Sequence, residues 1–232
     1  MTDTSASVPP APDDGTEGDP RIRVAVAYHS GSGHTRVLAE AVAGGASDAG
    51  AQTALVGVDT ITDEQWSWLD SADAIVFGAP TYMGTASAAF HRFAQDSAGR
   101  WARRAWCDKL AAGFTVAGAM SGEKLQTLQY FTILASQHGM HWVSLDLKPG
   151  WCTVSGSANE LNRLGITLGA GAQVNTDEGP EAVSRSDRDT ARHLGRRIAR
   201  TASLFPAAPP PGIVTSRRGA TPPPAAQPVS TR

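Results

Sequence analysis

A run of small and hydroxylated residues has the composition of a phosphate-binding loop. It reads Ser30-Gly31-Ser32-Gly33-His34-Thr35, and it lies between a short apolar run and a segment with helical spacing of apolar residues. The glycines allow the backbone to curl so that successive amides point inward, and the start of a helix adds its positive end. Such a loop can bind a phosphate without Lys or Arg. A plain strand-to-helix turn, with Gly and Ser serving only as caps, is the alternative interpretation.

Two familiar nucleotide loops do not fit this run. A dinucleotide-binding loop needs GxGxxG, and its third glycine falls on Arg36; Asp59 could imitate the ribose-binding acid, but the loop itself does not match. The GxxxxGK[ST] pattern of triphosphate-binding loops does not occur in the sequence. The run therefore favours a phosphate monoester over a triphosphate.

Two further loops follow apolar runs that read as buried strands. The loop after Ala74–Ala79 is Pro80-Thr81-Tyr82-Met83-Gly84, whose aromatic ring could lie against a planar ligand or simply cap the core. The loop at the end of Leu110–Ala117 consists of Thr115, Val116, Ala117, Gly118, Ala119, Met120, Ser121 and Gly122. Its glycines would allow the backbone to approach a ligand closely.

His138 is the one titratable side chain near these loops to which we assign a catalytic hypothesis. It ends a predicted helix, directly before Gly139, and we expect it on the same sheet edge as the three loops. An unperturbed histidine titrates near neutral pH, which suits proton transfer. A helix C-terminal cap is the alternative interpretation.

The loops are separated by alternating strand and helix patterns. Strands are predicted over residues 23–28, 52–58, 74–79, 110–117 and 141–147, and helices over 36–50, 63–71, 87–96, 125–138 and 187–201. Residues 149–185 are expected to be a long irregular connection. This alternation predicts an α/β fold, a doubly wound parallel sheet with helices on both faces. Ligands of such sheets bind beyond the carboxyl ends of the strands, where the three loops lie.

Charge and composition divide the chain into three parts. Residues 1–20 hold five acids and no Lys or Arg, and residues 204–232 hold three Arg, no acids and many Pro and Ala. Removing both from the net charge of −2 leaves residues 21–203 with a net charge of about zero. We predict that both tails are disordered, because they have too few apolar residues to offset the entropy of ordering. Residues 21–203 are then one folded domain.

Several classes of protein are excluded by the same composition. No apolar run approaches the ~18 residues of a membrane-spanning helix, and the acidic N-terminus does not read as a secretory signal. Cys107 and Cys152 are too few and too far apart for a disulfide scaffold or a structural zinc site. A neutral domain also lacks the charge that attracts nucleic acid. We expect a soluble cytoplasmic protein with no metal, membrane or nucleic-acid partner.

Three motifs in this order make the chain resemble the flavodoxin-like family. They are SGSGHT after the first strand, GAPTYMGTAS at the third and LASQHGM before the fifth. The resemblance is closest to WrbA-type NAD(P)H:quinone oxidoreductases and the related NADPH-dependent FMN reductases, and it covers roughly residues 22–200. It implies a five-stranded sheet in the order 2-1-3-4-5.

The resemblance also implies a role for each motif. Residues 30–35 would bind the FMN phosphate, residues 81–83 of the cofactor-binding run 80–84 would line the isoalloxazine ring, and residues 115–120 would contact its other edge through backbone groups. His138 matches a histidine beside the flavin. Trp101 matches an aromatic residue that forms a wall of the site where nicotinamide and quinone bind alternately. Ser32 matches a position near the nicotinamide nucleotide.

These implied roles predict an FMN-dependent NAD(P)H dehydrogenase (quinone) that forms a homodimer or homotetramer. A flavodoxin-type electron carrier is the first alternative, although such carriers are generally strongly acidic and this domain is neutral. A flavin-binding protein without turnover is the second. The final predicted helix carries Arg188, Arg192, Arg196, Arg197 and Arg200. These could attract NADPH phosphates, but a solvated basic face is the interpretation we favour.

Overall fold

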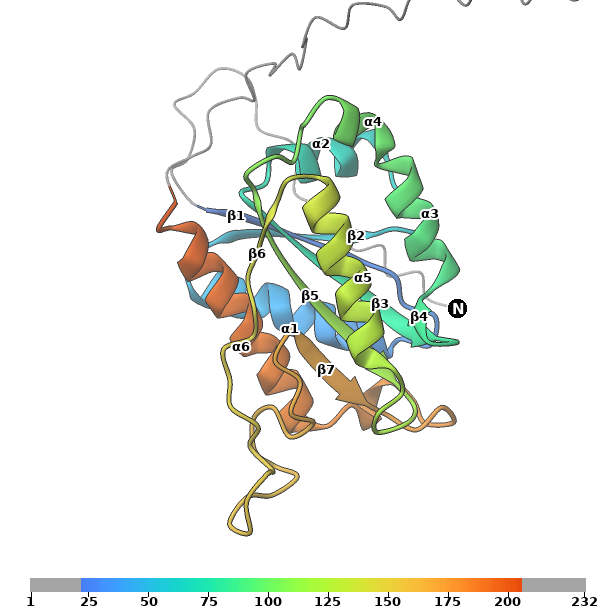
Figure 1. Ribbon diagram of the computed structural model, residues 1–232, viewed down its shortest axis with the longest axis vertical. Coiled ribbons are helices and arrows are strands. Elements are labelled where there is room, and N and C mark those ends of the chain that lie inside the picture. Colours follow the sequence, from blue (N-terminus) through green and yellow to red (C-terminus); the bar gives the residue numbers. More distant parts are fainter. Residues whose placement is uncertain (1–21, 206–232) are drawn as a thin grey trace, which may run out of the picture.

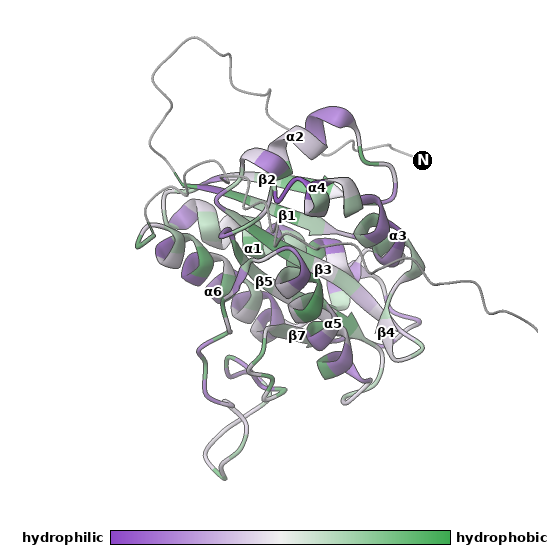
Figure 2. Ribbon diagram, turned by 45° about the horizontal axis from the view of Figure 1, so that its top comes forward, coloured by the Kyte–Doolittle hydropathy of each residue, from purple (hydrophilic) through white to green (hydrophobic). Residues whose placement is uncertain are grey.

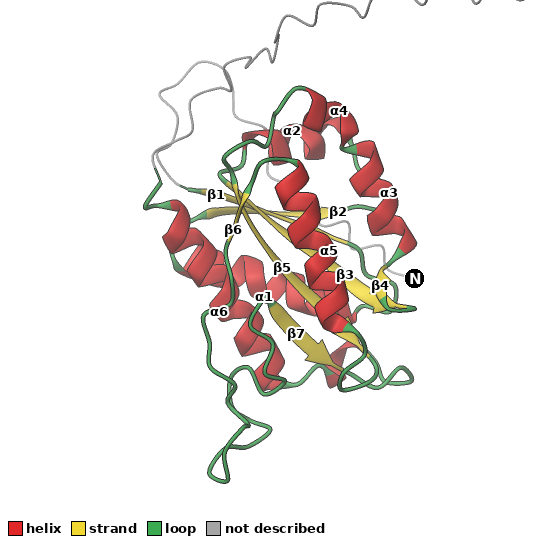
Figure 3. Cartoon of the chain, in the orientation of Figure 1, coloured by secondary structure: helices red, strands yellow, loops and turns green. Residues whose placement is uncertain are grey.

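The computed structural model describes residues 22–205, which form a parallel sheet between two layers of helices (Figures 1 and 3). Residues 1–20 and most of residues 204–232, which we predict to be disordered tails, lie outside the described residues. None of the helices within residues 22–205 is both long enough and apolar enough to cross a membrane.

The elements alternate along the chain as the sequence predicts. The strands are β1 (Arg23–Tyr28), β2 (Gln52–Gly57), β3 (Ala74–Tyr82), β4 (Thr85–Ala86), β5 (Leu110–Ala117), β6 (His141–Trp142) and β7 (Ala170–Gln173). The helices are α1 (His34–Asp48), α2 (Asp63–Ser71), α3 (Ala88–Asp96), α4 (Ala98–Ala102), α5 (Lys124–Gln137) and α6 (Arg185–Ala202), with a 3₁₀ turn, η1 (Pro180–Ala182). The sheet order β2-β1-β3-β5-β6 is the predicted 2-1-3-4-5.

The fifth strand position differs from the prediction. The strand expected over residues 141–147 is only two residues long, and it pairs with the first two residues of β5. The other half of β5 pairs with β7, so the expectation that residues 149–185 are irregular throughout was wrong. β7 reads Ala-Gly-Ala-Gln and has no β-branched or aromatic side chain, and a composition of this kind does not predict a strand. Between β6 and β7 the chain leaves the sheet and forms the protruding loop in Figure 1.

Both faces of the sheet are buried. Val24 and Val26 point into a core under α1 and α6, while Ala25 and Ala27 point into a second core under α2, α3 and α5. In Figure 2 the strands between the helices are mostly hydrophobic, whereas the helices carry both hydrophilic and hydrophobic residues. This double burial explains why the strands read as continuous apolar runs.

α1 and α6 lie unusually close together on their face of the sheet. A Cβ added to Gly195 would lie 1.9 Å from the backbone oxygen of Val42, and one added to Gly45 would lie 1.9 Å from that of Arg192. Each helix therefore requires a glycine where the other crosses it. The position of α1, and of the loop at its start, is fixed by this crossing.

Candidate functional site

The start of α1 leaves backbone amides available beyond the carboxyl end of β1. Gly33 precedes the helix in a left-handed conformation (φ 88°) and has no side chain that could cap it, and no acid lies in the first turn. The hydroxyl of Ser30 accepts a hydrogen bond from the amide of Arg36 (3.1 Å). Among the described residues, the amides of residues 32–35 donate to no protein acceptor. This end of α1 can therefore bind an anion.

The second loop is a tight hairpin rather than an open turn. β3 continues through Pro80 to Tyr82 and pairs antiparallel with β4. Met83 (φ 49°) and Gly84 (φ 85°) form the two-residue connection, as in a type I′ turn. Met83 is fully exposed at its tip, whereas Tyr82 lies against the first loop, where a Cβ on Gly31 would meet its hydroxyl at 2.6 Å.

A chain of threonine hydroxyls lies beneath this hairpin. Thr115 donates to the carbonyl of Ala79 (2.7 Å), and Thr81 lies 2.8 Å from both Thr115 and Thr127. Because the proton of Thr115 is used on Ala79, Thr115 must accept from Thr81, which must accept from Thr127. The hydroxyl protons of Thr81 and Thr115 are therefore engaged within the protein and are not free to donate to a ligand.

The third loop is held from behind by side chains of the protein. Gln173 donates to the carbonyl of Gly118 (2.8 Å). The ammonium group of Lys124 donates to the carbonyls of Ala119 (2.6 Å) and Met120 (2.9 Å). The backbone oxygens of this loop are thus occupied, and its amides are the groups that could contact a ligand.

A fourth segment, residues 174–180, closes the site and was not predicted from the sequence. His34 hydrogen-bonds to the carbonyl of Glu178 (2.8 Å), which ties this segment to the first loop. A Cβ on Gly33 would meet Pro180 at 2.5 Å, and one on Gly118 would meet Thr176 at 2.7 Å. The run VNTDEGP is typical of the loop after a strand, and this signal was missed because β7 was not recognised.

These four segments enclose a cleft of about 220 Å³ at the carboxyl edge of the sheet. Its lining residues are Ser32, His34, Thr35, Pro80, Thr81, Tyr82, Val116, Ala117, Gly118, Val174 and Thr176. No Asp, Glu, Lys or Arg is among them. The structure thus brings together the three loops singled out in the sequence, while Thr115 is buried beneath the cleft and Met120 is exposed.

His138 and Trp101 lie at the opposite edge of the sheet, so the expectation that His138 shares the edge of the three loops was wrong. Shortly after His138, His141 pairs with Leu110, the first residue of β5, whereas the cleft lies beyond its last residue. At ~3.3 Å per residue, the eight residues of β5 separate the two edges by roughly 23 Å. The physical reason is that a helix following a parallel strand runs back to the strand's start.

These two residues line an apolar depression of about 330 Å³ formed by α3, α4 and α5. Ser97 donates to the carbonyl of Ala94 (2.7 Å), so its oxygen must accept from Nε2–H of His138 (2.9 Å). Nδ1 of His138 then carries a lone pair and is buried, with no hydrogen-bond partner among residues 22–205. Burial lowers the pKa of His138 to about 4, against a weaker opposing effect of Asp70. The imidazole is therefore neutral at pH 7 and is not a ready proton donor.

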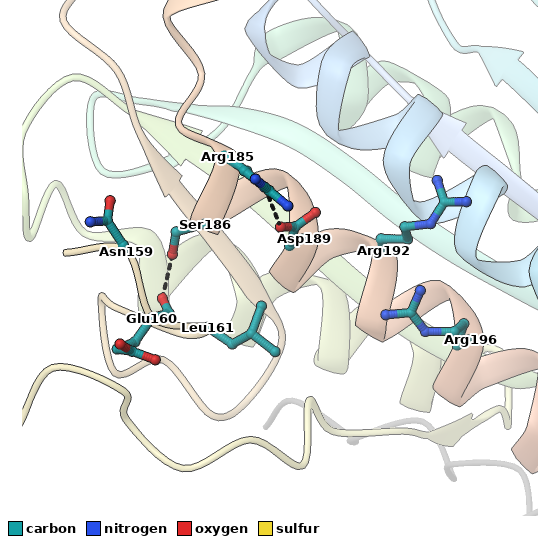
Figure 4. A pocket seen from close by; sticks show the side chains of 8 residues that line it. All are labelled: Asn159, Glu160, Leu161, Arg185, Ser186, Asp189, Arg192 and Arg196. Atoms are coloured by element: carbon teal, nitrogen blue, oxygen red, sulfur yellow. Dashed lines mark hydrogen bonds and ion pairs between the residues drawn. The ribbon is translucent and has the colours of Figure 1, made fainter. Parts of the chain in front are cut away.

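The arginine face of α6 borders a separate groove of about 610 Å³, shown in Figure 4. Arg192 binds both carboxylate oxygens of Asp48 on α1 at 2.7 Å, and Arg196 lies 3.4 Å from the same carboxylate. At the start of the helix, Arg185 points toward Asp189 (Figure 4). These arginines pair with Asp48 of α1 and Asp189 of α6, which leaves less net charge to attract a nucleotide phosphate.

The cleft fits FMN on the chemistry of its groups. The free amides at the start of α1 suit a phosphate, and no neighbouring acid repels it. The backbone around Gly31 and Gly33 approaches Tyr82 and Pro180 so closely that a side chain at either glycine would collide with them. The rest of the lining is uncharged and partly apolar, as a flavin ring requires.

The comparison with known families shows which family the chain belongs to. A family model described as NADPH-dependent FMN reductase matches residues 20–146. The chain belongs to the NADPH-dependent FMN reductase family. Membership confirms the predicted resemblance and makes FMN the cofactor that this oxidoreductase family implies.

Relatives of this FMN reductase family member have two kinds of name. Flavodoxin FldP of Pseudomonas aeruginosa is 39% identical over 181 residues, which cover 77% of this chain and 95% of that protein. An NAD(P)H dehydrogenase (quinone) of Caulobacter vibrioides is 31% identical over 202 residues, which cover 78% and 96%. The crystal structure of a flavodoxin, WrbA-like protein from Agrobacterium tumefaciens superimposes with a TM-score of 0.64 at 38% identity, covering 79% of this chain and 98% of that one. The fold is therefore flavodoxin-like.

Proposed function

We propose that this protein binds FMN in the cleft and catalyses the reaction of NAD(P)H, a proton and a quinone to NAD(P)⁺ and a hydroquinone. The observation that carries the proposal is the uncharged cleft at the carboxyl edge, which combines an anion-binding helix start with an exposed aromatic side chain, Tyr82. FMN, when bound, would accept a hydride from the nicotinamide and deliver two electrons to the acceptor. Relatives named NAD(P)H dehydrogenase (quinone) support the choice of donor and acceptor.

In this proposal the chain provides binding and orientation. The amides of residues 32–35 and the hydroxyl of Ser32 bind the phosphate. Tyr82, 47% exposed and in contact with the first loop, offers a flat surface at the cleft. The amides of the third loop supply donors to the ring edge, because the carbonyls of that loop are already engaged.

We propose that Trp101 and His138 act at the cleft of a second copy of the chain. The family resemblance implies that both act beside the flavin, yet in one chain they lie at the far edge of the sheet. If the depression of a second copy faced the cleft, Trp101 and His138 of that copy would lie beside the flavin. Trp101, which is 54% exposed, would then form a wall of the substrate site. Trp101→Ala should then lower the apparent mass in size-exclusion chromatography and raise the KM for quinone, while leaving bound FMN unchanged.

An electron carrier is the second candidate function, because the relative at 39% identity is named a flavodoxin. Carriers dock to partner proteins, and an electric field steers that encounter. The charge-free lining of the cleft and the neutral domain of residues 21–203 provide little such field. This contrast favours a small-molecule acceptor.

The decisive experiment combines a visible spectrum with a steady-state assay. The purified protein should be yellow, release FMN on heating, and oxidise NADH or NADPH rapidly when benzoquinone is present. A protein that holds FMN but oxidises neither nicotinamide with quinone would support the carrier, and a colourless protein that takes up no FMN would refute both functions.

A pair of glycine variants links the activity to the cleft. Gly31→Val places a side chain against Tyr82 and should weaken FMN binding at least tenfold, whereas Gly57→Val, where a Cβ has nothing within 4 Å, should not. Equal FMN affinities for the two variants would place the flavin outside the cleft.

A further inference from the structure

Lys124 is a cation buried beneath the third loop, and the role of the cleft described so far does not account for it. It is 1% exposed and is the first residue of α5. Its ammonium group donates to the carbonyls of Ala119 (2.6 Å), Met120 (2.9 Å) and Ser121 (3.2 Å). A lysine ammonium has three protons, so each of them has a carbonyl partner.

Keeping a charge at this place is energetically unfavourable. Burial lowers the pKa of Lys124 to about 8, Asp187 of α6 opposes this effect, Arg163 adds to it, and Glu123 opposes it weakly. Asp187 is itself bound to Arg163 at 2.7 Å, which reduces its pull on the lysine. The positive end of α5 also disfavours a cation at its first residue. If this side chain served only to fill the space beneath the loop, an apolar side chain would do so at a lower cost in free energy.

The lysine determines which backbone groups of the loop remain available. Gly122 (φ 54°) and Glu123 (φ 49°) are both left-handed, and they bend the chain around the ammonium group. A Cβ on Gly122 would lie 3.0 Å from the carbonyl of Ala119, one of the carbonyls that Lys124 binds. Within residues 22–205, the amides of residues 118–121 donate to no protein acceptor. The carbonyls face the lysine or Gln173, and the amides are left for a ligand.

We propose that Lys124 is a positioning residue for the flavin: it turns the carbonyls of the third loop inward, offers the loop amides to the FMN ring, and adds a positive charge that favours electron uptake. The proposal rests on the proposed function, since it takes FMN to be the ligand of the cleft. Hydrogen-bond donors and a nearby cation both stabilise negative charge that accumulates on a bound ring. Lys124 should therefore make bound FMN easier to reduce.

The chain contains a matched control for this lysine. Lys109 is half-buried, its ammonium group donates to the carbonyls of Asp70 (2.8 Å) and Ala72, and burial lowers its pKa. It directly precedes β5 and so lies at the amino edge of the sheet, away from the cleft. Replacing it removes a second lysine whose ammonium group is bound by backbone carbonyls, without touching the third loop.

The test compares Lys124→Met, Lys124→Gln and Lys109→Met with the wild type. The reduction potential of bound FMN is measured by equilibration with a reference dye, and FMN affinity by fluorescence titration of the apoprotein. We expect Lys124→Met to lower the preference for reduced over oxidised FMN at least tenfold, which is about 30 mV for a two-electron couple, and to weaken FMN binding. Lys124→Gln, which keeps donors but no charge, should lower the potential while binding oxidised FMN nearly as the wild type does. Lys109→Met should change neither quantity.

Wild-type potential and FMN affinity in both Lys124 variants would overturn the proposal, as would equal changes in Lys109→Met. If Lys124→Met does not fold, the lowered potential expected of Lys124→Gln remains the test. A wild type that holds FMN but turns over no quinone refutes the proposed function and still allows the potentials to be compared. A wild type with quinone turnover and unchanged potentials in the variants refutes the role of Lys124 alone.

Discussion

Acidification should destabilise this protein through His138. The buried imidazole has its pKa lowered from 6.5 to about 4. Between these values the unfolded chain binds a proton at His138 and the folded chain does not, so falling pH favours unfolding. Each tenfold difference in proton affinity corresponds to about 1.4 kcal/mol, which makes the full effect roughly 3 kcal/mol. That is a large part of a typical domain stability of about 5–15 kcal/mol.

The assay is urea denaturation of the wild type and two variants from pH 7.5 to pH 4.5. His138→Gln keeps an amide donor for Ser97 but cannot be protonated, so its free energy of unfolding should decline less over this range. His141→Gln, which replaces an exposed histidine three residues away, is the comparison variant. Burial also lowers the pKa of His193, but His193 is present in all three proteins and its effect cancels in the comparison.

The outcome that would refute this reasoning is specific. If the wild type and His138→Gln lose stability in parallel, within about 1 kcal/mol, then His138 is not held neutral by burial. The hydrogen bond to Ser97 would then not define its tautomer, and a proton-donor role at neutral pH would have to be considered again.

Three further predictions concern other parts of the fold. Gly195→Ala should destabilise the protein by about 2 kcal/mol or more in urea denaturation, because its Cβ would meet the backbone of α1, whereas Gly57→Ala in open space should be nearly neutral. Raising the pH from 8 to 10.5 should stabilise the wild type relative to Lys124→Met by up to roughly 3 kcal/mol. The reason is that the folded chain releases its proton at Lys124 at a lower pH than the unfolded chain does. Free energies of unfolding that change with pH in parallel in the two proteins would refute this. Thr127→Val should destabilise the folded protein by about 1–2 kcal/mol in thermal unfolding, because Thr81 then loses its buried donor. Thr132→Val, which removes only a hydrogen bond within α5, serves as the comparison.

Much of the fold follows from local sequence pattern. β1, α2 and β5 have the predicted bounds, because continuous apolar runs and helical spacing are strong signals in a sheet covered on both faces. The split of the fifth strand was not predictable in this way. Ala170–Gln173 pairs with the half of β5 that β6 leaves uncovered on the side away from β3, and that requirement is visible only in three dimensions.

The site was predicted less completely than the fold. The three loops at the carboxyl edge were found because glycine and hydroxyl residues directly follow apolar strands. Val174 and Thr176 were missed together with the strand that positions them. Lys124 was missed because a lysine after a polar stretch reads as a solvent-exposed side chain, and only the structure shows its ammonium group enclosed by carbonyls.

The crossing of α1 and α6 has a consequence for how the protein is made. α1 emerges early from the ribosome, but the helix it packs against is the last of the described elements to be synthesised. The end of α1 that we propose to bind the phosphate therefore lacks its support until nearly the whole domain has left the exit tunnel. Cofactor capture should follow translation rather than accompany it, and a chain truncated before residue 185 should be released without the ability to retain FMN.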